Sequence, residues 1–169
     1  MPRMKGSLAG LIAIVAAVTV SACGGGGSDA TSTATGPHVD AAALRTCIDK
    51  AGIKTGPVPP DALLYSYGQQ ATGDGGATFI VTQPLSQLIV FPDPVDIDEA
   101  KSELGSAEQT GGLRADGMHA DTLGNVLVVY FVGTTPETKA PIETCLGGKG
   151  TPVPGFEVPY YATRTNPQQ

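Results

Sequence analysis

His119 and Asp121 are two positions apart in residues 117–122, a stretch in which polar and apolar residues alternate. Successive side chains of a β-strand point to opposite faces, so this spacing predicts that both side chains lie on the same face. An imidazole and a carboxylate placed in this way can supply two ligands to a metal ion. A solvated polar face on the open side of a half-buried sheet explains the same pattern without a metal. We favour this second interpretation and take His119 and Asp121 as the candidate binding face.

Neither a transition-metal site nor a calcium site is predicted. Apart from His119, the only histidine is His38, so a histidine-rich metal site has no second ligand nearby in the sequence. One acidic cluster has the charge to attract calcium, but it lacks the Asp-x-Asp-x-Asp/Asn-Gly order of an EF-hand loop. Helix capping and favourable charge at a helix N-terminus explain the cluster without a metal. It consists of Asp93, Asp96, Asp98 and Glu99.

No catalytic residue and no cofactor are predicted. The chain has no G-x-S-x-G nucleophile elbow. The glycine-rich residues 73–76 are not followed by the Lys-Ser/Thr of a phosphate-binding loop, and a loop before a strand explains them better. A Ser/His/Asp arrangement would have to use His119 or His38 without local support. A catalytic site assembled from residues distant in the sequence stays open.

The tyrosines offer another candidate binding surface, for glycans or peptides. Two of them alternate in a possible short strand, residues 63–67, and two lie in a Pro-rich segment near the C-terminus. Packing at the edge of the core and in a docked tail is the simpler explanation. The four residues are Tyr65, Tyr67, Tyr160 and Tyr161.

Hydrophobic spacing predicts three helices separated by two strand pairs. Helices are expected to begin near Asp40, Asp96 and Pro141, where a capping residue or a proline precedes apolar positions at helical spacing. The sequence therefore predicts an α+β fold in the order helix-ββ-helix-ββ-helix, with an antiparallel sheet of four or five strands and helices mainly on one face. The paired strands are expected at residues 77–82, 87–91, 117–122 and 126–132.

The start of the chain has the pattern of a secretory signal. Arg3 and Lys5 give it a basic beginning, and residues 8–20 form an apolar core. This core is too short to span a bilayer as a helix, which distinguishes it from a transmembrane segment.

The apolar core ends in Val-Ser-Ala-Cys at residues 20–23, and a Gly- and Ser-rich stretch follows. An aliphatic residue, two small residues and a cysteine in this position resemble the lipobox of bacterial lipoproteins. The resemblance implies that residues 1–22 are removed and that Cys23 carries the lipid that holds the protein on a membrane. An ordinary secretory signal with a cysteine near its cleavage site is the alternative.

Cys47 and Cys145 remain once Cys23 is assigned to the lipid, and each lies in a predicted helix beside apolar residues. Disulfides persist outside the cytosol. We therefore predict a Cys47–Cys145 disulfide that joins the first helix to the last. Two free buried thiols stay open, as does a redox or metal-binding pair, although no C-x-x-C motif supports the latter.

Composition divides the chain into four parts. Residues 1–22 are the signal peptide, and residues 23–39 are the lipidated cysteine followed by a tether. Gly, Ser, Thr and Ala dominate this tether, which predicts flexibility. Residues 40–162 are expected to form one domain, which is large enough for a single core. Residues 163–169 are expected to be a loose tail.

The charge of the chain argues against nucleic acid as a partner. The net charge is −6, and removal of Arg3 and Lys5 with the signal peptide leaves −8. An acidic protein is a poor ligand for phosphate backbones or anionic lipid headgroups through its charge.

These observations predict a lipid-anchored protein on the extracytoplasmic side of the cell envelope. Its membrane contact is the lipid on Cys23, and its expected partner is another envelope protein. The expected role is that of a non-catalytic binding module stapled by a disulfide. A small extracytoplasmic hydrolase or thiol-redox protein with an unrecognised site is the alternative.

Overall fold

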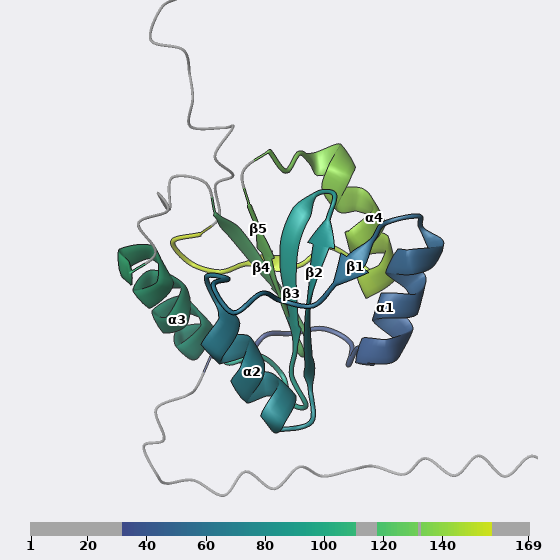
Figure 1. Ribbon diagram of the computed structural model, residues 1–169. Coiled ribbons are helices and arrows are strands. Elements are labelled where there is room, and N and C mark those ends of the chain that lie inside the picture. Colours follow the sequence, from purple (N-terminus) through teal and green to yellow (C-terminus); the bar gives the residue numbers. More distant parts are fainter. Residues whose placement is uncertain (1–31, 111–117, 132, 157–169) are drawn as a thin grey trace, which may run out of the picture.

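The computed structural model of this chain describes residues 32–110, 118–131 and 133–156. The predicted signal peptide, Cys23 and the predicted tail 163–169 lie outside these residues. Within them, helices are separated by single short strands or by strand pairs (Figure 1). In order, the elements are α1 (Ala41–Lys50), β1 (Thr55–Gly56), α2 (Tyr65–Gly73), β2 (Ala77–Thr82), β3 (Leu85–Val90), α3 (Ile97–Thr110), β4 (His119–Leu123), β5 (Val126–Tyr130), α4 (Pro136–Leu146) and β6 (Thr151–Pro152).

The strands of the described chain form one antiparallel sheet in the order β1-β2-β3-β5-β4-β6. Strands β2 and β3 form one hairpin, β4 and β5 form the other, and β3 pairs with β5 at the centre. Both predicted strand pairs and the α+β class are thus confirmed. The sheet has six strands rather than four or five, because β1 and β6 are two-residue edge strands that are too short to show a period-two pattern.

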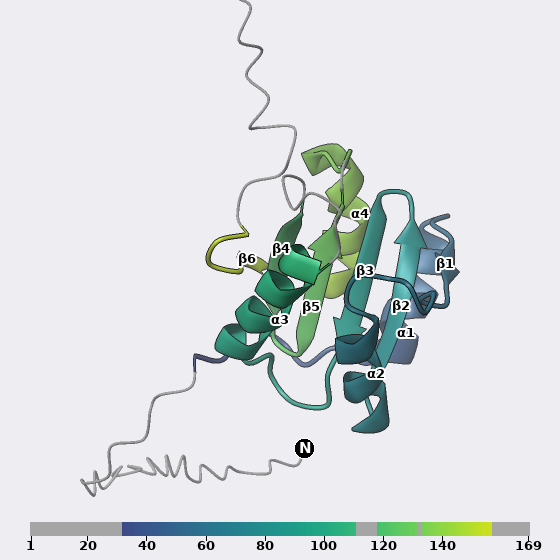
Figure 2. The same cartoon turned by 60° about the vertical axis from the view of Figure 1, so that its left-hand side comes forward.

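Helices cover both faces of the sheet. Figure 1 views the sheet nearly edge-on, with α2 and α3 on one side and α1 and α4 on the other. In Figure 2, α2 and α3 lie in front of the sheet and α1 and α4 lie behind it. Each pair of helices buries its own hydrophobic cluster against the sheet. The prediction of helices mainly on one face is therefore wrong.

The central strand β5 shows why both faces need a cover. Leu127 and Val129 join the core under α2 and α3, whereas Val126, Val128 and Tyr130 join the core under α1 and α4. All five residues are buried. A strand that is apolar on both faces is stable only when both faces are removed from water.

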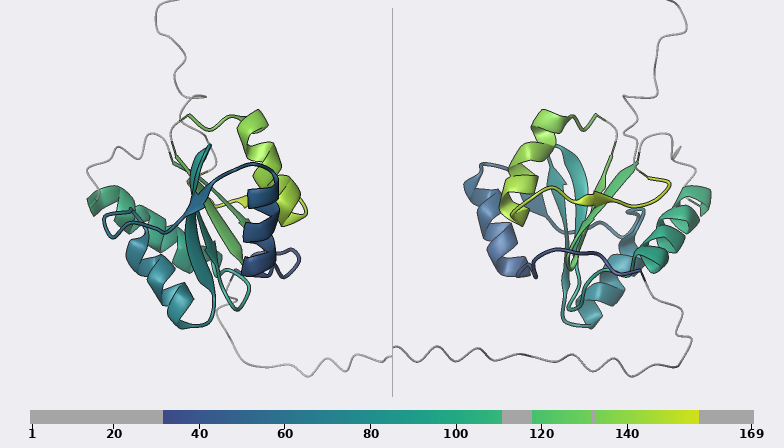
Figure 3. Two further views of the ribbon diagram at one scale, coloured as in Figure 1. Left: turned by 45° about the vertical axis from the view of Figure 1, so that its right-hand side comes forward. Right: turned by 180° about the vertical axis from the view of Figure 1, so that it is seen from behind.

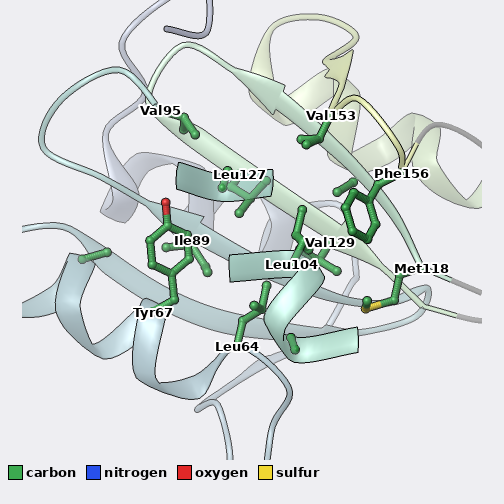
Figure 4. Packing of buried hydrophobic residues seen from close by; sticks show 14 of the residues in the cluster. Leu64, Tyr67, Ile89, Val95, Leu104, Met118, Leu127, Val129, Val153 and Phe156 are labelled. Atoms are coloured by element: carbon green, nitrogen blue, oxygen red, sulfur yellow. The ribbon is translucent and has the colours of Figure 1, made fainter. Parts of the chain in front are cut away.

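Helix α2 lies where the sequence analysis expected a short strand at residues 63–67. The alternation of Tyr65 and Tyr67 favours a strand locally. Tyr67 instead faces the core from one side of the helix and is 4% exposed, close to Leu64 and Ile89 (Figure 4). Tertiary packing overrides the local preference here, and the missed helix is one of the two that cover the second face.

Gly68 permits the close approach of α2 to the sheet. A Cβ atom at this position would lie 2.7 Å from Thr78 Oγ1 and 3.0 Å from Thr78 Cβ. Real Cβ atoms essentially never come within 3.0 Å of a neighbour. A glycine in the middle of a helix is locally unfavourable, so its packing against Thr78 is the physical reason for its presence.

The predicted beginnings of two helices are confirmed. Asp40 Oδ1 accepts a hydrogen bond from the backbone N–H of Ala43 at 2.8 Å at the start of α1. Asp96 Oδ1 accepts from the backbone N–H groups of Asp98 and Glu99 at 3.0 and 3.1 Å at the start of α3. These carboxylates satisfy donors that a helix leaves without an intrahelical partner.

Helix α4 begins earlier than predicted. Thr135 caps it in a reciprocal arrangement with Thr138, and Pro136 occupies the first turn. Pro141, the expected start, lies inside the helix. The first proline was the better signal, because a proline at the first helical position has no N–H that would need a partner.

The predicted disulfide between Cys47 and Cys145 is present. Their Cα atoms are 5.6 Å apart, and their positions differ by 98 residues in the sequence. The bridge joins α1 to α4 on the same face of the sheet. Both helices also bury apolar side chains in one core, which contains Leu44, Ile48, Ile142 and Leu146.

Residues 32–39, which we call the strap, pack on the domain although they were predicted to belong to the tether. The backbone N–H of Ile97 donates to Ser32 O at 2.8 Å, and that of Ala34 donates to Val95 O at 2.8 Å. Ala34 is 7% exposed and belongs to the core under α2 and α3. Among the described residues, the strap is therefore packed against the predicted domain 40–162.

Candidate functional site

The structure buries both residues of the predicted binding face. His119 and Asp121 share one face of β4, as their spacing predicts, but this face meets Lys139 of α4. His119 is 6% exposed and Asp121 is 5% exposed. The prediction of an open, solvated face is therefore wrong, because the sheet is covered on both sides.

His119, Asp121 and Lys139 form a compact group that we call the polar cluster. His119 Nε2 lies 2.7 Å from Asp121 Oδ1, and Lys139 Nζ donates to Asp121 Oδ2 at 2.6 Å. Lys139 Nζ also lies 2.8 Å from His119 Nε2. The side chains of His119, Asp121 and Lys139 retain 7%, 7% and 13% of their exposure. Each polar head in the cluster thus contacts the two others.

The tautomer of His119 decides how hydrogen atoms are shared in the polar cluster. Nε2 donates to the Asp121 carboxylate when it carries a hydrogen, and accepts from the Lys139 ammonium when it does not. The ammonium of Lys139 donates to the second carboxylate oxygen. His119 Nδ1 is buried without a hydrogen-bond partner among the described residues. Asp121 is consequently the best satisfied member of the cluster.

Tyr130 of β5 lines the polar cluster. Its ring stacks on His119 with centroids 5.8 Å apart and an interplanar angle of 28°. Lys139 Nζ lies 4.4 Å from the centre of the same ring, within the range of a cation–π interaction. Burial and the negative charges of Asp121 and Glu143 raise the pKa of Tyr130 far above its ordinary value, so its hydroxyl stays neutral.

Two opposing effects act on the Asp121 carboxyl. Burial disfavours its ionised form and acts to raise its pKa. The hydrogen bonds from His119 and Lys139, together with the positive charges of these two residues, outweigh burial and lower the pKa of Asp121 below its ordinary value. Asp121 is therefore a carboxylate throughout the neutral range.

The polar cluster fastens α4 to β4. Carboxylate, imidazole and ammonium groups can transfer protons when a substrate reaches them. Here Asp121 already binds two partners, and little of any of the three side chains reaches solvent. The three side chains therefore attach α4 to the sheet, and they are not placed to react with a substrate at the surface.

Lys139 and Tyr130 were not recognised in the sequence as partners of His119 and Asp121. The signal for Lys139 was the capping pattern at Thr135 and Pro136, which extends α4 over residue 139. Lys139 then lies on the helix face of Ile142 and Leu146, at i, i+3 and i+7. Tyr130 had no such signal, because its pairing with His119 depends on the register of β4 and β5.

The other candidate residues have structural roles where the structure describes them. No group of three or more His, Cys, Asp or Glu residues that could hold a metal ion occurs in the described part of the chain. Asp96 caps α3 and Tyr67 lies in the core. At Gly76 in the glycine-rich loop, a Cβ would lie 2.0 Å from Val90 O, so close backbone packing accounts for that glycine. Tyr160 and Tyr161 lie outside the described residues.

No known protein family matches this chain, and neither the curated proteins nor the solved structures contain a significant match to it. None of the helices in residues 32–110, 118–131 and 133–156 is long and apolar enough to cross a membrane.

Proposed function

We propose that this chain is a lipid-anchored protein of the cell envelope whose disulfide-bonded domain binds another envelope component. The anchor would be a lipid on Cys23, which ends the lipobox-like residues 20–23. The domain would face the extracytoplasmic side and act as a non-catalytic interaction module.

The pairing of the cysteines is the observation that supports this proposal most directly. The chain has three cysteines, and two of them form the bridge between α1 and α4. A disulfide of this kind persists in an oxidising compartment outside the cytosol. Cys23 is then the one cysteine outside the bridge, and it occupies the lipobox position.

Burial of the polar cluster changes where a binding surface is to be sought. The side chains of His119 and Asp121 contact Lys139 rather than solvent, so they are not the proposed contact residues. A protein partner would instead contact the outer faces of the helices or the turns at the ends of the sheet.

The anchor is tested by expressing the full chain in a bacterium and measuring the intact mass of the membrane-extracted protein. We expect a product that begins at Cys23 and carries acyl chains, and we expect Cys23→Ala to release the protein from the membrane. Cys47→Ser with Cys145→Ser is the matched control, because it removes two other cysteines and should leave the lipid in place. A soluble, unacylated product would overturn the anchor.

The binding role is tested by cross-linking in intact cells, with the Cys23→Ala protein as the control for anchoring. One dominant envelope protein, captured less by the unanchored variant, is the expected result. Capture at background level would contradict the interaction module and favour the hydrolase or thiol-redox alternative. The thiol-redox form of that alternative further requires that a mild reductant opens Cys47–Cys145 in the folded protein.

A further inference from the structure

The strap crosses one end of the sheet, from the side of α3 to the side of α1 (Figure 3). Thr33 forms a bridge with Asp96 immediately before α3. The backbone N–H of Gly124, in the turn between β4 and β5, donates to Thr35 O at 3.1 Å. The strap is thus attached to two separate parts of the domain at this end of the sheet.

Asn125 holds the last residue of the strap. Its Oδ1 accepts from the backbone N–H of Val39 at 2.7 Å, and its Nδ2 donates to Val39 O at 3.1 Å. The same Nδ2 donates to Phe91 O at 2.7 Å. Asn125 is 1% exposed, so these hydrogen bonds replace contacts with water that it cannot make.

Two glycines allow the strap to lie against the turn. Gly36 has a φ of +145°, and a Cβ there would lie 2.7 Å from the backbone nitrogen of Gly124. A Cβ at Gly124 would lie 2.1 Å from Pro37 O. Neither position accommodates a side chain without moving the strap, so this close contact requires glycine at both positions.

The strap shortens the chain between the predicted lipid and the domain. Cys23 and Ser32 are nine positions apart, so the connection spans at most about 30–32 Å. Without the strap the connection would run to Asp40 and reach about 56–61 Å. A compact domain of this size has a radius of gyration of about 14 Å and hence a diameter of roughly 35 Å. The shorter connection is therefore less than one domain diameter.

The ends of the sheet are well separated along β3. The first, which we call the anchor end, holds the strap, the Gly124-Asn125 turn and Val90, which pairs with Val126. The second, which we call the distal end, holds Ser86 paired with Tyr130 and the turn that leads into Leu85. Leu85 is 50% exposed and is the exposed large hydrophobic residue of the described chain.

We propose that the strap sets the orientation of the domain on the membrane, with the anchor end facing the lipid surface and the distal end facing away from it. This inference rests on the proposed lipid on Cys23. Turning the distal end to the membrane would place residue 32 roughly one domain diameter, about 35 Å, from the surface, which even a fully extended connection of about 30–32 Å barely approaches, whereas the opposite orientation needs no such extension.

The charge of the anchor end determines how it meets the membrane. Its acidic side chains are those of Asp40, Asp74, Asp93, Asp96, Asp98 and Glu99, and Lys101 follows in the first turns of α3. An anionic lipid surface repels such a group of carboxylates within a Debye length of about 8–10 Å. This repulsion opposes close contact, so the length of the connection and not the charge is what holds the anchor end toward the membrane.

The orientation is tested by energy transfer from a single tryptophan to a labelled lipid headgroup, because the chain contains no tryptophan of its own. Pro92→Trp places the donor at the anchor end, and Leu85→Trp places it at the distal end; both positions are exposed. In vesicles that contain the lipidated protein, we expect transfer from Pro92→Trp to exceed that from Leu85→Trp by roughly twofold or more, since the donors are seven positions apart along extended chain and lie up to about 23–25 Å from each other. Equal transfer from the two variants would overturn the inference.

A longer connection is the matched control for the strap. Insertion of about eight Gly and Ser residues before Ser32 leaves every strap contact in place and restores a reach of about 56–61 Å. We expect the difference in energy transfer between Pro92→Trp and Leu85→Trp to become smaller. An unchanged difference would show that the length of the connection does not set the orientation, and would contradict the inference.

Chemical coupling of a lipid to Cys23 distinguishes a failure of this inference from a failure of the proposed anchor. Because Cys47 and Cys145 are bonded to each other, Cys23 can be coupled selectively to a maleimide lipid in vesicles. Greater energy transfer from Pro92→Trp than from Leu85→Trp in this preparation supports the role of the strap even if the cell does not acylate Cys23. In that case only the proposed function fails. Equal transfer from both donors here overturns the inference and leaves the anchor standing.

Discussion

Lys139 Nζ lies 2.6 Å from Asp121 Oδ2, so a charged residue of α4 meets a charged residue of β4 beneath the helix. The two side chains are 13% and 7% exposed, and most of the water that would solvate them is excluded. When one partner of such a pair is removed, the other charge stays buried without compensation. The pair therefore makes the attachment of α4 sensitive to single substitutions.

Lys139→Met is expected to lower the free energy of unfolding by about 3 kcal/mol, at the lower end of the range for breaking a buried pair. The methionine keeps the length of the side chain but leaves Asp121 with His119 alone. Urea denaturation followed by circular dichroism measures this loss, with Lys149→Met as the exposed control. Combining Lys139→Met with Asp121→Asn should recover part of the loss. A loss no greater than that of the control would show that Asp121 does not depend on Lys139.

Acidification is expected to destabilise the domain in the range where Asp121 takes up a proton. The pKa of Asp121 is lower in the folded protein than its ordinary value of about 3.9, so its carboxylate stabilises the fold above about pH 4. This contribution is lost as the pH falls from there through the folded-state pKa. Urea titrations between neutral and strongly acidic pH should show a smaller acid dependence for Asp121→Asn than for the exposed control Asp61→Asn. If the free energy of unfolding depended on pH in the same way for both variants, Asp121 would not be the source of the acid sensitivity.

Reduction of Cys47–Cys145 is expected to lower stability without abolishing the fold. Opening a loop of 98 residues costs up to about 4–5 kcal/mol in the chain-entropy description. The buried contacts of Leu44 and Ile142 in the shared core remain after reduction. Thermal melts of the wild type and of the double variant Cys47→Ser/Cys145→Ser measure the effect. Reductant should shift the first protein and not the second, and an equal shift in both would implicate something other than the bridge.

Gly68→Ala is expected to destabilise the domain by about 1–3 kcal/mol, because the added methyl group meets Thr78 at 2.7 Å and overpacks the contact between α2 and β2. Gly73→Ala is the matched control in the same helix, since no atom lies within 4 Å of its added Cβ. Thr78→Ala in the Gly68→Ala background should restore part of the loss. Equal stability of the Gly68→Ala and Gly73→Ala proteins in chemical denaturation would mean that α2 lies farther from the sheet.

Local signals were sufficient where a feature depends on neighbouring residues. Asp40 and Asp96 accept backbone hydrogen bonds within the first turn of α1 and α3, so each cap was recognisable from a short stretch of sequence. The Gly124-Asn125 turn between β4 and β5 likewise depends only on neighbouring residues. Cys47 and Cys145 were predictable as a pair because only two cysteines remained after Cys23.

Helix α2 was missed because local and tertiary preferences conflict there. Tyr65 and Tyr67 alternate as in a strand, and Gly68 weakens a helix. Burial of Tyr67 and the close contact of Gly68 with Thr78 decide in favour of the helix, and both depend on a sheet formed later in the chain. The loss of α2 from the prediction left α3 as the only predicted helix on that face of the sheet.

The sequence by itself determined the α+β class, the two hairpins, the disulfide and the shared face of His119 and Asp121, because periodicity, turn residues and cysteine number act over short distances. Only the tertiary structure decided that this face is buried, since α4 brings Lys139 over it from another part of the chain. It also decided that the strap belongs to the domain, because Asn125 holds Val39 across a separation of 86 residues. Contacts of that kind depend on how distant elements pack, and no local pattern encodes them.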